Sequence, residues 1–132
     1  MTRRGAQMVE FALLFPFLIV LVTGVIDVGW YLSTEVALIE AVRAGAWRGS
    51  RTLQGESPLA VAVVASTDAW SFGSHRGQGP PLFDASFVGT KPTQLVRVRG
   101  TLDSAPLIGL VPVPSAHRAE FLVRMVEQPA VP

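Results

Sequence analysis

The chain has 132 residues, of which 49% are hydrophobic, and its mean hydropathy is +0.41. Its formal net charge is only +1, which disfavours a nucleic-acid-binding surface, because such a surface needs a clear basic excess. The chain has no cysteine, so disulfides, thiolate metal sites and cysteine nucleophiles are excluded. Without its apolar N-terminal block, roughly 100 residues remain, enough for one small domain.

A long apolar run begins near the N-terminus. No residue from 11 to 26 is charged, and Thr23 is the one polar residue among them. Counted to Trp30, the run covers about 20 residues, or roughly 30 Å of helix, which matches the hydrocarbon core of a bilayer. Arg3 and Arg4 precede the run and favour an orientation with the N-terminus in the cytoplasm.

A carboxylate opens this apolar run. A charge within a membrane helix costs roughly 2.5–3.5 kcal/mol at mid-helix on insertion scales, so Glu10 indicates a function. Cleavage after Gly5 would leave the free amine of Ala6 about one helical turn from this carboxylate. Such an amine on a neighbouring subunit is a natural partner for Glu10, and the pair would set the axial register of parallel helices. Pro16 removes one backbone hydrogen bond, which predicts a kink or local melting.

Two simpler interpretations of the same segment are an uncleaved signal anchor and a conventional signal peptide. The signal peptide fits less well, because the apolar stretch is long, Pro16 lies in its middle and no small-residue cleavage site follows promptly. Neither interpretation explains why a glutamate opens the apolar helix.

Two helices are predicted after the span. Residues 33–49 predict a stalk helix continuous with the membrane segment, and Ser57 followed by Pro58 predicts the start of a second helix over 59–70. The stalk carries apolar residues at intervals of three and four, which we expect to pack on the chain's own domain rather than on a partner. This predicted stripe comprises Leu32, Val36, Ile39, Val42 and Ala46.

The C-terminal half predicts strands. Residues 82–89 form a candidate edge strand, and residues 94–102 and 117–127 alternate apolar and polar side chains, as strands with one buried face do. We therefore predict an α+β fold, in which a long N-terminal transmembrane and stalk helix and a second short helix accompany a small antiparallel sheet of two or three strands.

The segment between the last two strands, APLIGLVPVPS at 105–115, is too apolar for a solvated loop and too short to span a membrane. One interpretation is a flap that covers the open edge of the sheet. The other is an exposed patch that contacts a partner subunit or the membrane surface.

Catalytic and ligand sites are poorly supported. His75 and His117 lack the carboxylate pattern of a metal site, and Ser104 or Ser115 with His117 and Asp103 lacks a nucleophile-elbow motif. The run GSHRGQG lacks the lysine and hydroxyl ending of a phosphate loop. We predict no catalytic residue, metal or cofactor.

Basic residues recur on one face of the predicted sheet. A solvated outer face explains this pattern better than a binding stripe, because Glu120 dilutes the charge. The residues concerned are Arg97, Arg99, Arg118 and Arg124.

The combination resembles a known family. GAQMVEFALLFPFLIVLVTGVIDVG resembles the N-terminus of TadE-like proteins, the minor pseudopilins of tight-adherence (Flp, type IVc) pili, and STEVALIEAVRAGAWRGS is similar to their post-membrane helix. LVRVRGTLDSAPLIGLVPVPSAHRAEFLVRMVE follows the family's order of strand, apolar connection and strand. The resemblance implies a prepilin leader at 1–5, a transmembrane helix at 6–32 and a small extracytoplasmic pilin-like domain at 33–132.

The same resemblance implies a protein of the bacterial inner membrane, with its N-terminus inside and its C-terminus outside, that can enter an extracellular pilus. A prepilin peptidase would cut between Gly5 and Ala6, and Glu10 would be the glutamate at position five of the mature chain. Phe11 stands where major pilins usually have tyrosine, which indicates a minor subunit. The implied partners are other pilin subunits and the pilus assembly platform, with roles in pilus assembly and surface adhesion and none with nucleic acid.

Two alternatives stay open. The chain could be an unprocessed, single-pass membrane-anchored binding module that captures a partner through LIGLVPVP. It could also be a pseudopilin of a secretion system, which shares the cleavage but has different partners.

Overall fold

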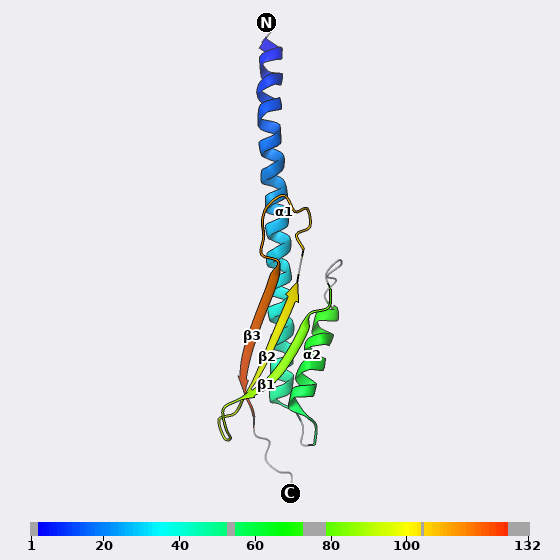
Figure 1. The fold of residues 1–132 in the computed structure, drawn as a ribbon, viewed down its shortest axis with the longest axis vertical. Coiled ribbons are helices and arrows are strands. Elements are labelled where there is room, and N and C mark those ends of the chain that lie inside the picture. Colours follow the sequence, from blue (N-terminus) through cyan, green and yellow to red (C-terminus); the bar gives the residue numbers. More distant parts are fainter. Residues whose placement is uncertain (1–2, 53–54, 73–78, 104, 127–132) are drawn as a thin grey trace.

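A computed structural model describes residues 3–52, 55–72, 79–103 and 105–126. It contains a long helix, a short helix and a three-stranded antiparallel sheet, so the predicted α+β architecture is confirmed (Figure 1). In chain order the elements are α1 (Arg3–Ser50), α2 (Pro58–Phe72), β1 (Leu82–Val88), β2 (Leu95–Asp103) and β3 (Ala116–Arg124).

The helix α1 is continuous over 48 residues, as predicted for a span that runs into a stalk. It passes through Pro16 without a break, so the expected local melting does not occur. One missing backbone hydrogen bond does not end a helix whose other turns are intact. At the C-terminal end, the Ser50 hydroxyl donates to the Trp47 carbonyl at 2.9 Å and the Thr52 hydroxyl donates to the Gly49 carbonyl at 3.1 Å. These bonds satisfy carbonyl groups that the helix itself leaves free.

The short helix α2 begins where the sequence predicts it. Pro58 occupies the first turn, where a missing N–H costs nothing, and the Val61 N–H donates to the Ser57 carbonyl at 3.0 Å. The polar segment therefore ends, and α2 begins, at Pro58.

The three strands follow one another in the order β1-β2-β3, each antiparallel to the next, and β1 is the edge strand that the sequence predicts. The predicted alternation is confirmed, because Val96, Val98 and Leu102 are buried in β2 while Arg99 and Thr101 are exposed. Glu127, the last residue of the predicted third strand, lies outside the described residues.

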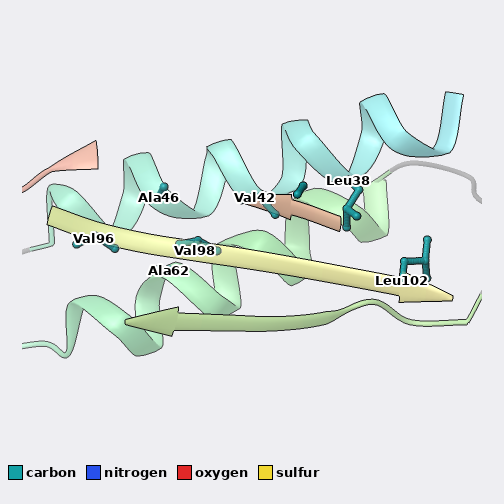
Figure 2. Close-up of a cluster of buried hydrophobic side chains, with 8 residues drawn as sticks. Leu38, Val42, Ala46, Ala62, Val96, Val98 and Leu102 are labelled. Carbon is teal, nitrogen blue, oxygen red and sulfur yellow. The ribbon is translucent and has the colours of Figure 1, made fainter. Parts of the chain in front are cut away.

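The core lies between one face of the sheet and the two helices (Figure 2). The helix α1 packs against β2 and β3, and α2 packs against α1 and β1. The buried cluster consists of Leu38, Val42, Ala46, Ala62, Val96, Val98, Leu102 and Ala119.

The predicted apolar stripe of the stalk is wrong in its first half. Leu32, Val36 and Ile39 are 53%, 57% and 44% exposed, whereas Val42 and Ala46 are fully buried. The buried face of α1 is rotated about the helix axis relative to the predicted stripe, because this helix must pack on a sheet and on α2 together. That face consists of Thr34, Leu38, Ala41, Val42, Gly45, Ala46, Gly49 and Ser50.

The two helices approach closely at a pair of glycines one turn apart. A Cβ atom at Gly45 would overlap the Ser66 hydroxyl and lie 2.5 Å from the Ala62 carbonyl oxygen. A Cβ at Gly49 would lie 2.8 Å from the Pro58 carbonyl oxygen. Only glycine permits this approach, so these two positions determine the distance between α1 and α2.

The apolar connection at 105–115 does not cover an edge of the sheet, so the flap interpretation is wrong. The edges are β1 and β3, whereas the connection lies beyond the ends of the strands, beside α1 (Figure 1). Its backbone contacts Asp27 and its Val111 side chain lies against Gly24. The acceptors offered by the helix, rather than the open strand edge, decide where this loop lies.

Candidate functional site

The N-terminal half of α1 stands apart from the rest of the protein. Every residue from 7 to 22 is exposed, and burial begins only at Thr23 and Gly24. Within the described residues, α1 is the one helix long and apolar enough to cross a membrane, with a mean hydropathy of 2.5 in its most apolar window and none of that window buried. We call residues 7–22 the free half of α1, and its composition suggests membrane anchoring.

The residues predicted for assembly all lie on this free half. Glu10 is exposed, and it is the only charged residue between 7 and 22. Phe11 is 64% exposed, and its ring lies 5.6 Å from that of Phe15, one turn along the same helix. Pro16 is exposed within the unbroken helix. The structure therefore leaves Glu10 and Phe11 available to another molecule.

The predicted cleavage point lies in the first turns of α1. Gly5 is exposed, and a Cβ built on it would meet nothing within 4 Å. The backbone of Ala6 is helical, so its nitrogen is about one turn, or roughly 6 Å along the axis, from Glu10. The helical geometry is compatible with a pairing between the amine of one subunit and the carboxylate of the next, since both lie near the N-terminal end of α1.

Thr23, the polar residue within the apolar run, needs no outside partner. Its hydroxyl donates to the carbonyls of Ile19 and Val20, at 2.9 Å and 3.0 Å. Hydroxyl groups in membrane helices commonly satisfy themselves in this way.

A second carboxylate, Asp27, has a role that the local sequence pattern did not predict. Asp27 is fully buried, and its two oxygens accept hydrogen bonds from the backbone N–H groups of Ile108, at 2.8 Å, and Gly109, at 3.1 Å. One signal could have found it. A carboxylate in an apolar helix needs donors, and an apolar loop contains backbone donors that need acceptors.

The loop held by Asp27 exposes large apolar side chains. Leu107, Ile108 and Leu110 are 56%, 45% and 57% exposed, and we call these three residues the loop patch. The loop is seated on α1 by Val111, whose Cγ2 lies 3.1 Å from the place that a Cβ of Gly24 would take. The interpretation of the connection as an exposed patch agrees with this placement.

His117 is a structural residue. Its side chain is 2% exposed, its ring lies 4.3 Å from that of Tyr31, and neither ring nitrogen has a hydrogen-bond partner among the described residues. Burial lowers the pKa of His117 below its ordinary value, and the charge of Glu35 opposes this shift. Burial thus disfavours the charged form of the imidazole, which packs on Tyr31 of α1.

The outer face of the sheet carries the predicted basic residues with their acidic partner. Glu120 lies 3.1 Å from Arg97 Nε and 2.8 Å from Arg99 Nε, and Arg118 and Arg124 are exposed. This arrangement supports a solvated outer face, because the Glu120 carboxylate is shared by two guanidinium groups and neutralises part of their charge.

The described residues contain no group of three or more histidine, cysteine or acidic side chains that could hold a metal ion. His75 and Ser104 lie outside the described residues. Asp103 and Ser115 are exposed, whereas His117 is buried under Tyr31. The three are not arranged as an accessible triad.

An exposed, membrane-length helix that continues into a small α+β domain is the organisation of a pilin-like protein. The family model of TadE-like proteins matches residues 5–47, which confirms the resemblance over nearly all of α1. The chain is thus similar to TadE-like proteins in this region, and the similarity suggests a pilin-like protein associated with the tight-adherence (Tad, Flp) pilus. Neither a curated protein nor a solved structure matches the chain. The resemblance of the last two strands to TadE-like proteins lies outside the matched range and stays a prediction.

Proposed function

We propose that this protein is a minor pilin or pseudopilin subunit of a tight-adherence type IV pilus, cut by a prepilin peptidase and active in pilus assembly and surface adhesion. It is inserted in the inner membrane with its N-terminus inside and its domain outside. The observation that carries the proposal is the exposed Glu10 at the start of the free half of α1. A carboxylate in this setting is stable only with a partner, and the chain offers one when Ala6 becomes its first residue.

The assembly step uses two exposed surfaces of α1. The first is the free half, where Glu10 would pair with the amine of a neighbouring subunit. The second is formed by Leu32, Val36 and Ile39, which the domain leaves uncovered. Both lie on one helix, so parallel copies can pack along its whole uncovered length.

The mature N-terminus tests the proposal. Protein purified from membranes of cells with their own prepilin peptidase should begin at Ala6 when its mass is measured. Gly5→Leu should block cleavage, because a bulky residue replaces a small one at the cut, whereas Gly5→Ala keeps a small residue and should still be cut. A wild-type chain beginning at Met1 or Thr2 would overturn the processing step.

The unprocessed binding module is the second candidate, and the loop patch favours it, because large apolar side chains are exposed there. An intact N-terminus in membranes would support this candidate. A pseudopilin of a secretion system would be cut at the same place, and co-purification with tight-adherence components rather than secretion components separates the two.

A further inference from the structure

We propose that the loop patch enters the outer leaflet of the membrane and contacts lipid, so that the protein meets the bilayer through two segments rather than one. The proposal depends on the membrane crossing of α1 and on neither the cleavage after Gly5 nor pilus assembly.

The first argument is position. From Phe11, where the uncharged run begins, Asp27 lies roughly 24 Å further along the helix axis, near the outer end of a hydrocarbon core of about 30 Å. The amides of Ile108 and Gly109 are bound to Asp27, so the loop lies at this level (Figure 1). If the free half of α1 is in the bilayer, the loop is at its outer boundary.

The second argument is continuity of the apolar surface. Within one turn of Asp27, the α1 residues Val25, Ile26 and Val28 are 66%, 42% and 43% exposed. The loop patch extends this surface sideways from the helix, since Leu107, Ile108 and Leu110 are similarly exposed. A surface continuous with a membrane helix and as apolar as that helix fits lipid chains.

The third argument concerns the backbone. An unsatisfied backbone N–H or C=O group is costly in the hydrocarbon core, so a loop that lies at its boundary gains from having few free donors. Residues 106, 112 and 114 are prolines, which have no N–H group. The N–H groups of Ile108 and Gly109 are both bound by Asp27. Five of the eleven residues 105–115 therefore present no free N–H donor to lipid.

The fourth argument is the charge pattern. No charged residue lies between Asp103 and Arg118, whereas both flanking residues are charged and exposed. Charged side chains at both ends of an uncharged loop mark where the chain returns to water, because a charge is costly within the bilayer.

Single-cysteine labelling tests the proposal, because the chain has no cysteine of its own. The full chain with Leu110→Cys is labelled with nitrobenzoxadiazole and reconstituted in phosphatidylcholine and phosphatidylglycerol vesicles. Two labelled controls accompany it: Val20→Cys on the free half, where the native residue is 51% exposed, and Leu122→Cys on the outer face of β3, where it is 42% exposed. Leu107→Cys provides a second probe of the patch.

We expect the label at Leu110→Cys to show blue-shifted emission, to be quenched by lipids with a doxyl group near the top of the acyl chain, and to resist aqueous iodide. Leu122→Cys should show the reverse. Quenching by iodide equal to that of Leu122→Cys at both patch positions overturns the proposal. A second adverse result is a label that neither iodide nor doxyl lipids quench and that becomes accessible when the protein is diluted in lipid. That result also overturns the proposal, because a second copy of the chain would then cover the patch. Val20→Cys separates the failures: if doxyl lipids quench Val20→Cys alone, the helix crosses the membrane and the loop does not enter it.

Discussion

The two halves of α1 are opposite in what they expose. The free half, residues 7–22, carries mainly large apolar side chains, all of them in the open. The buried face of the second half is built largely of small residues, among them Ala41, Gly45, Ala46 and Gly49. Burial in this helix therefore follows the space that the neighbouring elements leave rather than hydrophobicity. The bulky apolar surface remains available for lipid or for other copies of the helix, and the small residues hold the domain together.

On the free half of α1, the largest effect of a substitution is expected at Glu10. Glu10→Ala should reduce pilus assembly to background, because it removes the carboxylate that pairs with a neighbouring amine, while membrane insertion stays intact or becomes easier. The measurement is the amount of the protein in sheared surface fractions relative to membrane fractions. Gln7→Ala, another polar change on the free half, is the control and should assemble normally. Normal assembly of Glu10→Ala would show that the register role is wrong.

In the second half of α1, which packs on the sheet and on α2, the largest effect is expected at Gly45. Gly45→Ala should lower the free energy of unfolding by about 2 kcal/mol, because the new methyl group is forced into the backbone of α2. Gly29→Ala is the matched control. A Cβ at Gly29 meets nothing within 4 Å, so alanine there should be neutral or stabilise the helix by up to about 1 kcal/mol. Urea unfolding of the full chain in mild detergent, followed by the fluorescence of Trp70 and the other tryptophans, compares the two. Equal midpoints would refute the close approach of α1 and α2.

Asp27 lies between the two halves, and its loss should have an intermediate effect. Asp27→Ala should cost about 1–2 kcal/mol locally, because the amides of Ile108 and Gly109 lose their acceptor. Hydrogen exchange of these two amides should accelerate by about tenfold or more, since 1.4 kcal/mol corresponds to a factor of ten. Asp103→Ala, an exposed carboxylate near the start of the same loop, should leave their exchange unchanged. Unchanged exchange in Asp27→Ala would mean that the loop is held by other contacts.

The smallest effect is a pH dependence of the stability of the α+β domain. The pKa of His117 is lowered by burial, so the unfolded chain binds its proton more tightly than the folded one. Protonation of His117 therefore does not reduce the free energy of unfolding above the ordinary histidine pKa of about 6.5. Below it, the free energy of unfolding falls as the pH drops toward the pKa of the folded state. His117→Phe should remove this part of the pH dependence, which unfolding midpoints between pH 8 and pH 5 would measure. A wild-type midpoint that does not change over this interval would contradict the prediction.

Local sequence patterns were sufficient to predict the helices and the strands. Proline after serine marked the start of α2, and alternation marked the buried face of β2. They were insufficient where a position depends on neighbours that are distant in sequence. Leu32, Val36 and Ile39 had the right spacing for a buried stripe, yet the sheet and α2 pack on a different face of α1. Gly100 shows the same limit, because only the fold brings Val42 Cγ2 within 2.7 Å of where its Cβ would be.

The residues of the candidate site likewise divide into those that the sequence identifies and those that require the fold. Glu10, Gly5 and Ala6 belong to one short stretch, so spacing and chemistry alone singled them out. Asp27 required the fold, because its donors, at Ile108 and Gly109, are about 80 residues further along the chain.

Hydropathy and periodicity are local properties, so the amino-acid sequence alone predicts a membrane-length helix with a carboxylate at its start, joined to a small α+β domain. The fold was needed to show which face of α1 is covered, that Gly45 and Gly49 admit α2, and that Asp27 holds the apolar loop beside the helix. These depend on which segments meet in space, where close packing and the pairing of buried polar groups select one arrangement.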